Sequence, residues 1–280
     1  MTPPRPGPTG SATADELARI REFTHAVMRG SSTEVVPARG GFAVLNRDFP
    51  DSFEHNCLVV SSRVEADQLI AEADRILGGA GLAHRAIELE REDVDEAWLN
   101  RFRDLGFEVH RNLTMVWRRS LSRGAMAAVE RLPYRDLMPL VEASWRRYLP
   151  AASERTIRQL VDRRLVTHRA CQVTHHAVRG PAGLAARCDL YRIPPLAQVE
   201  DVETEPEWRN RGYATAVVLD SIALARESGC QLIFLYADGD DWPQQLYVRL
   251  GFDPVGGSYT MQRPGDSTLS ERTFAHVPSS

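Results

Sequence analysis

Residues 205–218, EPEWRNRGYATAVV, place two arginines and a glycine at a turn between a strand-like and a helix-like stretch. Arg209 and Arg211 would repel each other unless a negative group lay between or above them. The first amides of a helix lack partners within the helix and carry partial positive charge, and Gly212 lets the backbone approach a bound group closely. These features together predict a site for a phosphate or pyrophosphate.

Residue types exclude two other kinds of phosphate site. The turn has a single glycine and does not match the G-x-G-x-x-G fingerprint of dinucleotide sites. All 34 basic residues are arginines, which rules out a Walker-type loop, a Schiff base and a catalytic lysine. The absence of lysine and the many alanines are typical of a GC-rich, bacterial genome.

The strand-like stretch before the turn, LAQVEDVET, changes the side on which its apolar residues lie. Ala197 and Val199 share one face, whereas Val202 falls on the other. A β-bulge produces such a switch, although an irregular edge strand would give the same pattern. Acidic side chains follow one another closely here, at Glu200, Asp201, Glu203 and Glu205. We expect most of them to be solvated or to balance charge.

The composition limits the class of protein. The 280 residues are 43% hydrophobic and 26% charged with a net charge of −4, which is typical of a globular chain of one large or two ordinary domains and argues against a nucleic-acid surface. Without an apolar run of about 20 residues or a signal-peptide core, we expect a cytoplasmic protein with no membrane partner. The four cysteines are scattered, and His175 and His176 would face opposite ways on a half-exposed strand. No metal site is predicted.

The order of predicted elements repeats in the two halves of the chain. Segments 103–119 and 248–263 share Leu-Gly-Phe at a helix end and Thr-Met in the following strand. Each glycine would have to adopt the left-handed conformation that ends a helix. Chance could match one helix end, but a duplication also explains the repeated order. We therefore predict a disordered tail at 1–13, domains at 14–124 and 125–265, and a polar tail at 266–280.

The pattern Arg209-x-x-Gly212-x-Ala214, preceded by Pro206, resembles the acetyl-CoA pyrophosphate loop of the GNAT acetyltransferase superfamily. The segment DDWPQQLYVRLGF also resembles the later helix of that superfamily, which carries a tyrosine just before Leu-Gly-Phe. The resemblance is close over about 130–265 and covers the first half only in architecture. It implies an α/β (α+β) fold of two tandem GNAT-like domains, each with a mixed, mostly antiparallel sheet flanked by helices, and acetyl-CoA as co-substrate.

The resemblance also implies how the cofactor binds. A bulge before the loop would splay the next strand and open a slot for the pantetheine arm, whose amides would pair with backbone groups of the bulged strand. One later position, where relatives often have an asparagine, would contact pantetheine. The implied cofactor-binding residues are Val202, Thr204, Arg209, Asn210, Arg211, Gly212, Tyr213, Ala214, Thr215 and Asp240.

Two side chains are candidates for the chemistry. Transfer to an amine needs an uncharged amine, so a carboxylate near the thioester could take up its proton, and Glu200 lies beside the suspected bulge. The position used by some relatives aligns with Gln198, which cannot accept the proton, so the base could also lie elsewhere or be absent. Tyr247, four residues before Gly251, matches the tyrosine that faces the cofactor sulfur and could protonate the leaving thiolate, although an aromatic there is often only core.

The first half departs from the superfamily pattern. After NCLVVSS it reads RVEADQLI, with no glycine until the helix ends. We interpret it as a degenerate copy that packs against the second half or walls the substrate cleft. The chain is thus predicted to be an N-acetyltransferase acting on a primary amine of a small molecule or peptide by direct attack on the thioester, as a monomer or homodimer. The alternatives are a non-catalytic acyl-CoA-binding sensor or scaffold, and a nucleotide-binding protein, against which the missing Walker lysine argues.

Overall fold

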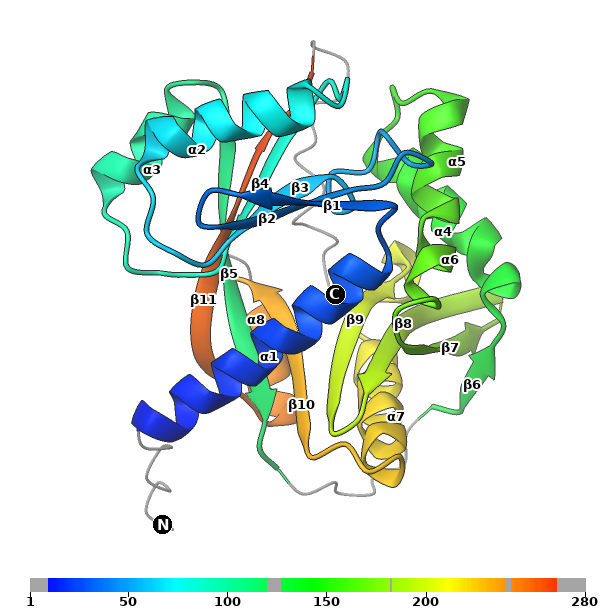
Figure 1. The fold of residues 1–280 in the computed structure, drawn as a ribbon. Helices are drawn as coiled ribbons and strands as arrows, with labels where there is room; N and C mark the ends of the chain where they lie inside the picture. The colour runs from blue at the N-terminus through cyan, green and yellow to red at the C-terminus, as the bar shows by residue number, and fades with distance from the viewer. Residues whose placement is uncertain (1–9, 120–126, 182, 240–242, 266–280) are drawn as a thin grey trace.

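A computed structural model describes residues 10–119, 127–181, 183–239 and 243–265. The described strands form one continuous sheet in the order β1-β2-β3-β4-β11-β5-β10-β9-β8-β7-β6 (Figure 1). The first half contains α1 (Gly10–Gly30), β1 (Glu34–Ala38), β2 (Gly41–Leu45), β3 (Cys57–Val60), α2 (Ala66–Ala73) with η1 (Asp74–Gly78), β4 (Arg85–Leu89), α3 (Glu96–Arg103) and β5 (Glu108–Trp117). The second half contains β6 (Val129–Leu132), α4 (Tyr134–Tyr148), α5 (Glu154–Asp162), α6 (Arg164–Thr167), β7 (Gln172–Gly180), β8 (Gly183–Ile193), β9 (Leu196–Thr204), η2 (Pro206–Trp208), α7 (Tyr213–Glu227), β10 (Leu232–Asp238), α8 (Pro243–Leu250) and β11 (Phe252–Arg263).

The two halves exchange their final strands. β3 pairs with β4 in parallel, and β9 pairs with β10 in parallel, so the same strand–helix–strand unit occurs once in each half. The strand that follows each unit then crosses to the other half: β11 pairs with β4, and β5 pairs with β10. β5 and β11 also pair with each other in the middle of the sheet. The sheet is therefore continuous across both halves, and the predicted junction near residue 125 lies outside the described residues.

The repeated Leu-Gly-Phe marks the same structural join in both halves. α3 is followed by Gly106 at φ +79°, and α8 by Gly251 at φ +99°. Left-handed backbone of this kind favours glycine because a Cβ would clash with the neighbouring carbonyl. The next residues, Phe107 and Phe252, enter two separate hydrophobic cores. The repeat predicted from sequence thus has a conformational cause.

Helices cover both faces of the sheet. α2 packs with Ile87 and Leu89 of β4, and α7 packs with Val199 of β9. α1 crosses the other face (Figure 1), where the ring of Phe23 lies 5.3 Å from that of Phe234 in an edge-to-face contact. Side chains alternate along a strand. The strand residues between those that pack against α2 and α7 therefore point toward α1. Among the described helices, none is both long and apolar enough to cross a bilayer.

Candidate active site

The turn between β9 and α7 has a backbone that suits an anion. Asn210 (φ +61°) and Gly212 (φ +78°) are both left-handed. Gly212 caps α7 without a side-chain hydrogen bond, and a Cβ at this position would meet no atom within 4 Å. Glycine is therefore favoured here by conformation, and open space lies before the first amides of α7, which have no partners within the helix.

Different neighbours hold the two arginines of the turn. Arg209 Nε donates to the carbonyl oxygen of Thr204 at 3.4 Å, and the Arg211 guanidinium lies 4.9 Å from the centre of the Trp208 ring. Within the described part of the chain, neither forms an ion pair with a carboxylate. Both charges therefore remain available at the positive end of the α7 dipole, as a bound diphosphate would require.

β9 and β10 begin as parallel neighbours and then separate. Pairing runs only from Leu196 opposite Leu232 to Gln198 opposite Phe234, although both strands continue for several residues. Separated strands present backbone amides and carbonyls with which an extended ligand can pair. The gap lies where the family resemblance implies a slot for an extended ligand.

A β-bulge in β9 lies beside this gap. Two residues of β9, Asp201 and Val202, stand opposite one residue of β8, where the pairing shifts between Arg187 and Asp189. Asp201 is left-handed, with φ +55°. The bulge predicted from the change of side in LAQVEDVET is confirmed.

Arginines neutralise the carboxylates around the bulge. The ion pairs are Arg164–Asp201, Arg187–Asp201, Arg187–Glu203 and Arg147–Glu205. Glu203 is 2% exposed, and Ser144 Oγ also donates to its Oε1 at 2.7 Å. These carboxylates balance charge in the protein interior, which was one of the two roles predicted for them, and they stabilise the bulged conformation.

Glu200 differs from these carboxylates because, among the described residues, no arginine forms an ion pair with it. Its carboxylate accepts a hydrogen bond from the amide of Gln198, two residues earlier on the same face of β9. Burial, followed by the negative charge of Glu54, raises the pKa of Glu200 to about 7. A carboxyl group that titrates near neutrality is matched to taking up a proton from a reacting amine. Gln198 and Glu200, the two positions considered for the general base in the sequence, therefore contact each other.

Gln198 and Glu200 line a cavity of about 350 Å³ between α1 and the sheet. Both halves of the chain contribute its walls. Sequence reasoning did not identify the lining residues Glu54, Glu88 and Tyr236. Polar residues that alternate with apolar ones in HRAIELE were a signal, but alternation by itself is also typical of a strand that faces solvent. Only the position of α1 turns this face into a cavity wall.

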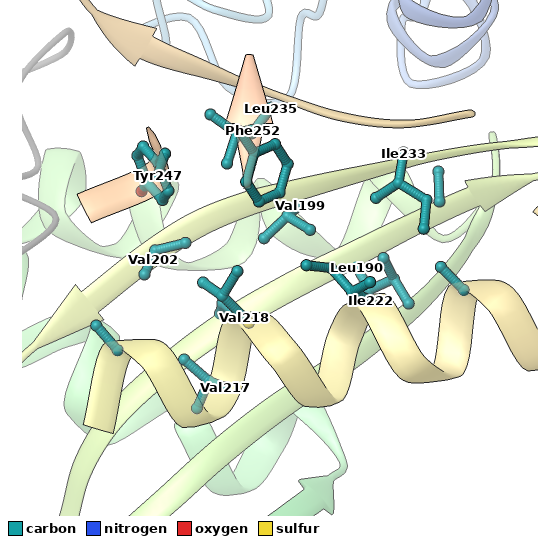
Figure 2. Packing of buried hydrophobic residues seen from close by; sticks show 14 of the residues in the cluster. Leu190, Val199, Val202, Val217, Val218, Ile222, Ile233, Leu235, Tyr247 and Phe252 are labelled. Atoms are coloured by element: carbon teal, nitrogen blue, oxygen red, sulfur yellow. The ribbon is translucent and has the colours of Figure 1, made fainter. Parts of the chain in front are cut away.

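Tyr247 lies in a hydrophobic cluster. It is 2% exposed, and its ring centre lies 6.0 Å from that of Phe252. Figure 2 shows it beside Phe252 and near Val202, which is itself buried. The side chains of Val202 and Thr204 point into the protein, so only their backbone groups suit the predicted contact with a ligand. Asp240, the remaining predicted cofactor residue, lies outside the described residues.

The adjacent histidines of β7 face opposite sides of the sheet, as predicted. His175 Nδ1 lies 2.7 Å from Asp189, and His176 Nδ1 lies 2.8 Å from Asp220 on α7. The expectation that they lie on a half-exposed strand is wrong, because they are 3% and 0% exposed. Helices from outside the strand cover both. The described residues contain no cluster of three or more His, Cys, Asp or Glu side chains that could hold a metal.

Comparison with known proteins shows which class of protein this fold resembles. Residues 136–252 match the model of the acetyltransferase (GNAT) family. A comparison with curated protein sequences finds no significant match. The matched residues run from the start of α4 to the start of β11 and include the turn between β9 and α7.

Solved structures extend the likeness to the whole fold. A conserved protein of unknown function from Staphylococcus epidermidis has a TM-score of 0.68 at 14% identity, over 83% of this chain and 94% of its own. A GCN5-related N-acetyltransferase from Kribbella flavida has a TM-score of 0.58 at 14% identity, over 91% and 96%. A tandem GNAT protein from the clavulanic acid biosynthesis pathway has a TM-score of 0.53 at 13% identity, over 91% and 96%. The fold is that of a tandem GNAT protein.

Proposed function

We propose that this protein is an N-acetyltransferase that transfers an acetyl group from acetyl-CoA to a primary amine bound in the cavity beneath α1. The observation that carries the proposal is the separation of β9 from β10 after Gln198 and Phe234. The separated stretch of β9 carries Glu200 at its start and leads into the α7 turn at its end. A single segment therefore connects an anion site, a backbone slot and a carboxylate that titrates near neutrality.

The anion site would bind the diphosphate of CoA. The first amides of α7 and the Arg209 and Arg211 guanidiniums provide the positive field, and Gly212 leaves room for the oxygens. The pantetheine arm would lie in the gap and pair with the backbone of Val202 and Thr204, as an additional strand would.

The chemistry needs one proton acceptor and one proton donor. Glu200 would take the proton from the amine as its nitrogen attacks the thioester carbon, directly or through a water molecule. The carbon–sulfur bond then breaks, and Tyr247 would donate its hydroxyl proton to the departing thiolate. Each positioned group of this kind contributes about 10²–10⁴-fold to the rate.

One observation favours a second candidate, a protein that binds an acyl-CoA without turnover. Tyr247 packs among apolar side chains as a structural aromatic residue would. A sensor or scaffold needs the anion site and the gap but neither the Glu200 carboxylate nor the Tyr247 hydroxyl.

A turnover screen distinguishes the two candidates. Acetyl-CoA is incubated with the chain and with monoamines, diamines, amino sugars and short peptides, and the release of free thiol is followed. Thiol release that depends on an acceptor and is lost in Glu200→Gln supports transfer. Saturable acetyl-CoA binding by calorimetry, with no acceptor-dependent release, favours the binding protein. Absence of acetyl-CoA binding would overturn both.

A further inference from the structure

Part of the sheet face beneath α1 is polar, although a covered face is ordinarily apolar. Its strands come from both halves because β5 and β11 are exchanged. The polar residues that line the cavity on this face include Glu88, Asn112, Gln198, Glu200, Thr260 and Gln262. Their neighbours along the strands, such as Ile87 and Met261, are buried in the cores of the opposite face. An enclosed polar surface needs polar partners in place of water.

The acidic groups of this cavity are only partly neutralised. Arg21 lies 3.3 Å from Glu90, and Arg163 lies 3.2 Å from Glu54. In the described ranges, Glu88 and Glu200 have no arginine or histidine within ion-pair distance. Glu88 instead accepts a hydrogen bond from the Thr260 hydroxyl at 2.9 Å. Two carboxylates, one from each half of the chain, therefore line the same cavity without an ion pair to a described arginine or histidine.

Burial and neighbouring negative charges raise the pKa values of both carboxylates. Burial is the main cause that raises the pKa of Glu88 to about 8, and the charges of Glu54 and Glu90 raise it further. The charge of Glu54 also raises the pKa of Glu200. Burial raises the pKa of Tyr236, whose hydroxyl bonds to Thr24 at 3.1 Å, and the charges of Glu90, Glu200 and Glu88 raise it further. Positive charge brought into the cavity would lower both pKa values and so favour the ionised form of both carboxylates.

An unpartnered amide gives an independent indication of a ligand. Gln262 lines the cavity and is 5% exposed, and its Oε1 has no hydrogen-bond partner among the described residues. Buried amide oxygens are nearly always bonded, and leaving one unbonded is costly. A ligand that donates hydrogen bonds would satisfy this side chain.

We propose that the acceptor is a small molecule with two cationic groups, and that Glu88 binds the cation that is not acetylated. This inference rests on the proposed function, in which Glu200 receives the proton of the reacting amine. One amine neutralises one carboxylate, so the second carboxylate selects for a second charge. The first half of the chain lacks a turn like the one between β9 and α7. Its role would thus be to bind the acceptor and to determine which acceptors are selected.

The size of the cavity and the position of α1 over it favour a small molecule over a peptide chain. α1 crosses the face (Figure 1) and contributes Ile20, Arg21 and Thr24 to the cavity wall. A volume of about 350 Å³ falls at the lower end of the range typical of small-ligand pockets.

Calorimetric titration without acetyl-CoA tests this proposal. The probes are straight-chain diamines of increasing length and the monoamine that matches each in length. The wild-type protein should bind at least one diamine about tenfold or more tightly than its matched monoamine, because a charge-assisted bond in a buried site has about that effect. Glu88→Gln should lose this preference and bind the monoamine as before. Glutamine has nearly the same shape and can still accept the Thr260 hydrogen bond, so the fold should be retained.

Glu65→Gln is the matched control, because Glu65 is exposed at the start of α2, makes no capping bond and does not line the cavity. It should behave as wild type. Equal diamine affinity in wild type and Glu88→Gln, or no diamine binding at all, would overturn the proposal. Parallel turnover assays keep the two proposals apart. Diamine binding that depends on Glu88 without thiol release would refute transfer alone. Acetylation of monoamines and diamines with equal kcat/KM, unaffected by Glu88→Gln, would refute the dicationic acceptor alone.

Discussion

Gln198 and Phe234 form the last pair at which β9 and β10 remain neighbours, and the two strands separate beyond them. The bulge at Asp201 follows within three residues of Gln198, and its carboxylate is held by two arginines. The bulge beside the separation thus contains an ion-paired, left-handed residue. It connects the α7 turn to the cavity beneath α1, and the predictions below test this arrangement.

The first prediction concerns the turn. Gly212→Glu should weaken acetyl-CoA binding by tenfold or more, because it puts a negative side chain where the diphosphate would bind. Calorimetry measures the affinity directly. Gly229→Glu is the matched control: Gly229 follows the other end of α7, has φ +81° and also has open space around its Cβ position. It should cost similar backbone strain and leave the affinity unchanged. If Gly212→Glu bound acetyl-CoA as tightly as wild type, the turn would not be the diphosphate site.

The second prediction concerns pH. Because the pKa of Glu200 is raised to about 7 and the base must be ionised, kcat/KM should fall about tenfold per unit as pH drops below about 7. Glu54→Gln should move this fall to lower pH, because the Glu54 charge helps to raise the Glu200 pKa. Titration of the substrate amine would not respond to Glu54. A fall that keeps its position in Glu54→Gln and persists in Glu200→Gln would exclude Glu200 as the base.

The third prediction concerns stability. Glu88 has a pKa of about 8 in the folded chain, against an ordinary value of 4.5, so the folded state binds more protons than the unfolded state between these pH values. Its contribution to the free energy of unfolding therefore falls as pH rises through this window, by up to about 1.4 kcal/mol per unit. Glu88→Gln should be increasingly more stable than wild type from about pH 5 to about pH 8 in urea titrations. Glu65→Gln should follow the wild-type curve. A constant difference between Glu88→Gln and wild type would show that Glu88 is ionised throughout.

The fourth prediction separates an enzyme from a binding protein. Tyr247→Phe removes one proton donor and little volume, so kcat should fall about 10²–10⁴-fold while acetyl-CoA affinity is retained. Tyr134→Phe is a matched control, because Tyr134 is also buried and its hydroxyl donates to the carbonyl of Val161 at 2.6 Å. That change should lower Tm and leave kcat unaffected. Full activity in Tyr247→Phe would assign Tyr247 to the core alone.

Features that depend on a few neighbouring residues could be predicted from the sequence. The left-handed Gly212, the side switch around the bulge and the two Leu-Gly-Phe joins are local, because backbone sterics and strand alternation act over a few positions. The sequence also shows that His175 and His176 face opposite ways. It does not show that they are buried, since that depends on helices elsewhere in the chain.

Only the tertiary structure revealed the exchange of β5 and β11 and the cavity beneath α1. Glu88 and Thr260, which are hydrogen-bonded, are separated by most of the chain, and nothing in either segment specifies the other as its partner. Strand pairing at such separations depends on the summed packing of the whole sheet. The sequence by itself therefore determined the turn with its left-handed Gly212 at the start of α7. The long-range pairing decided that a carboxylate from each half lines the same cavity, because only the assembled sheet brings those strands under α1.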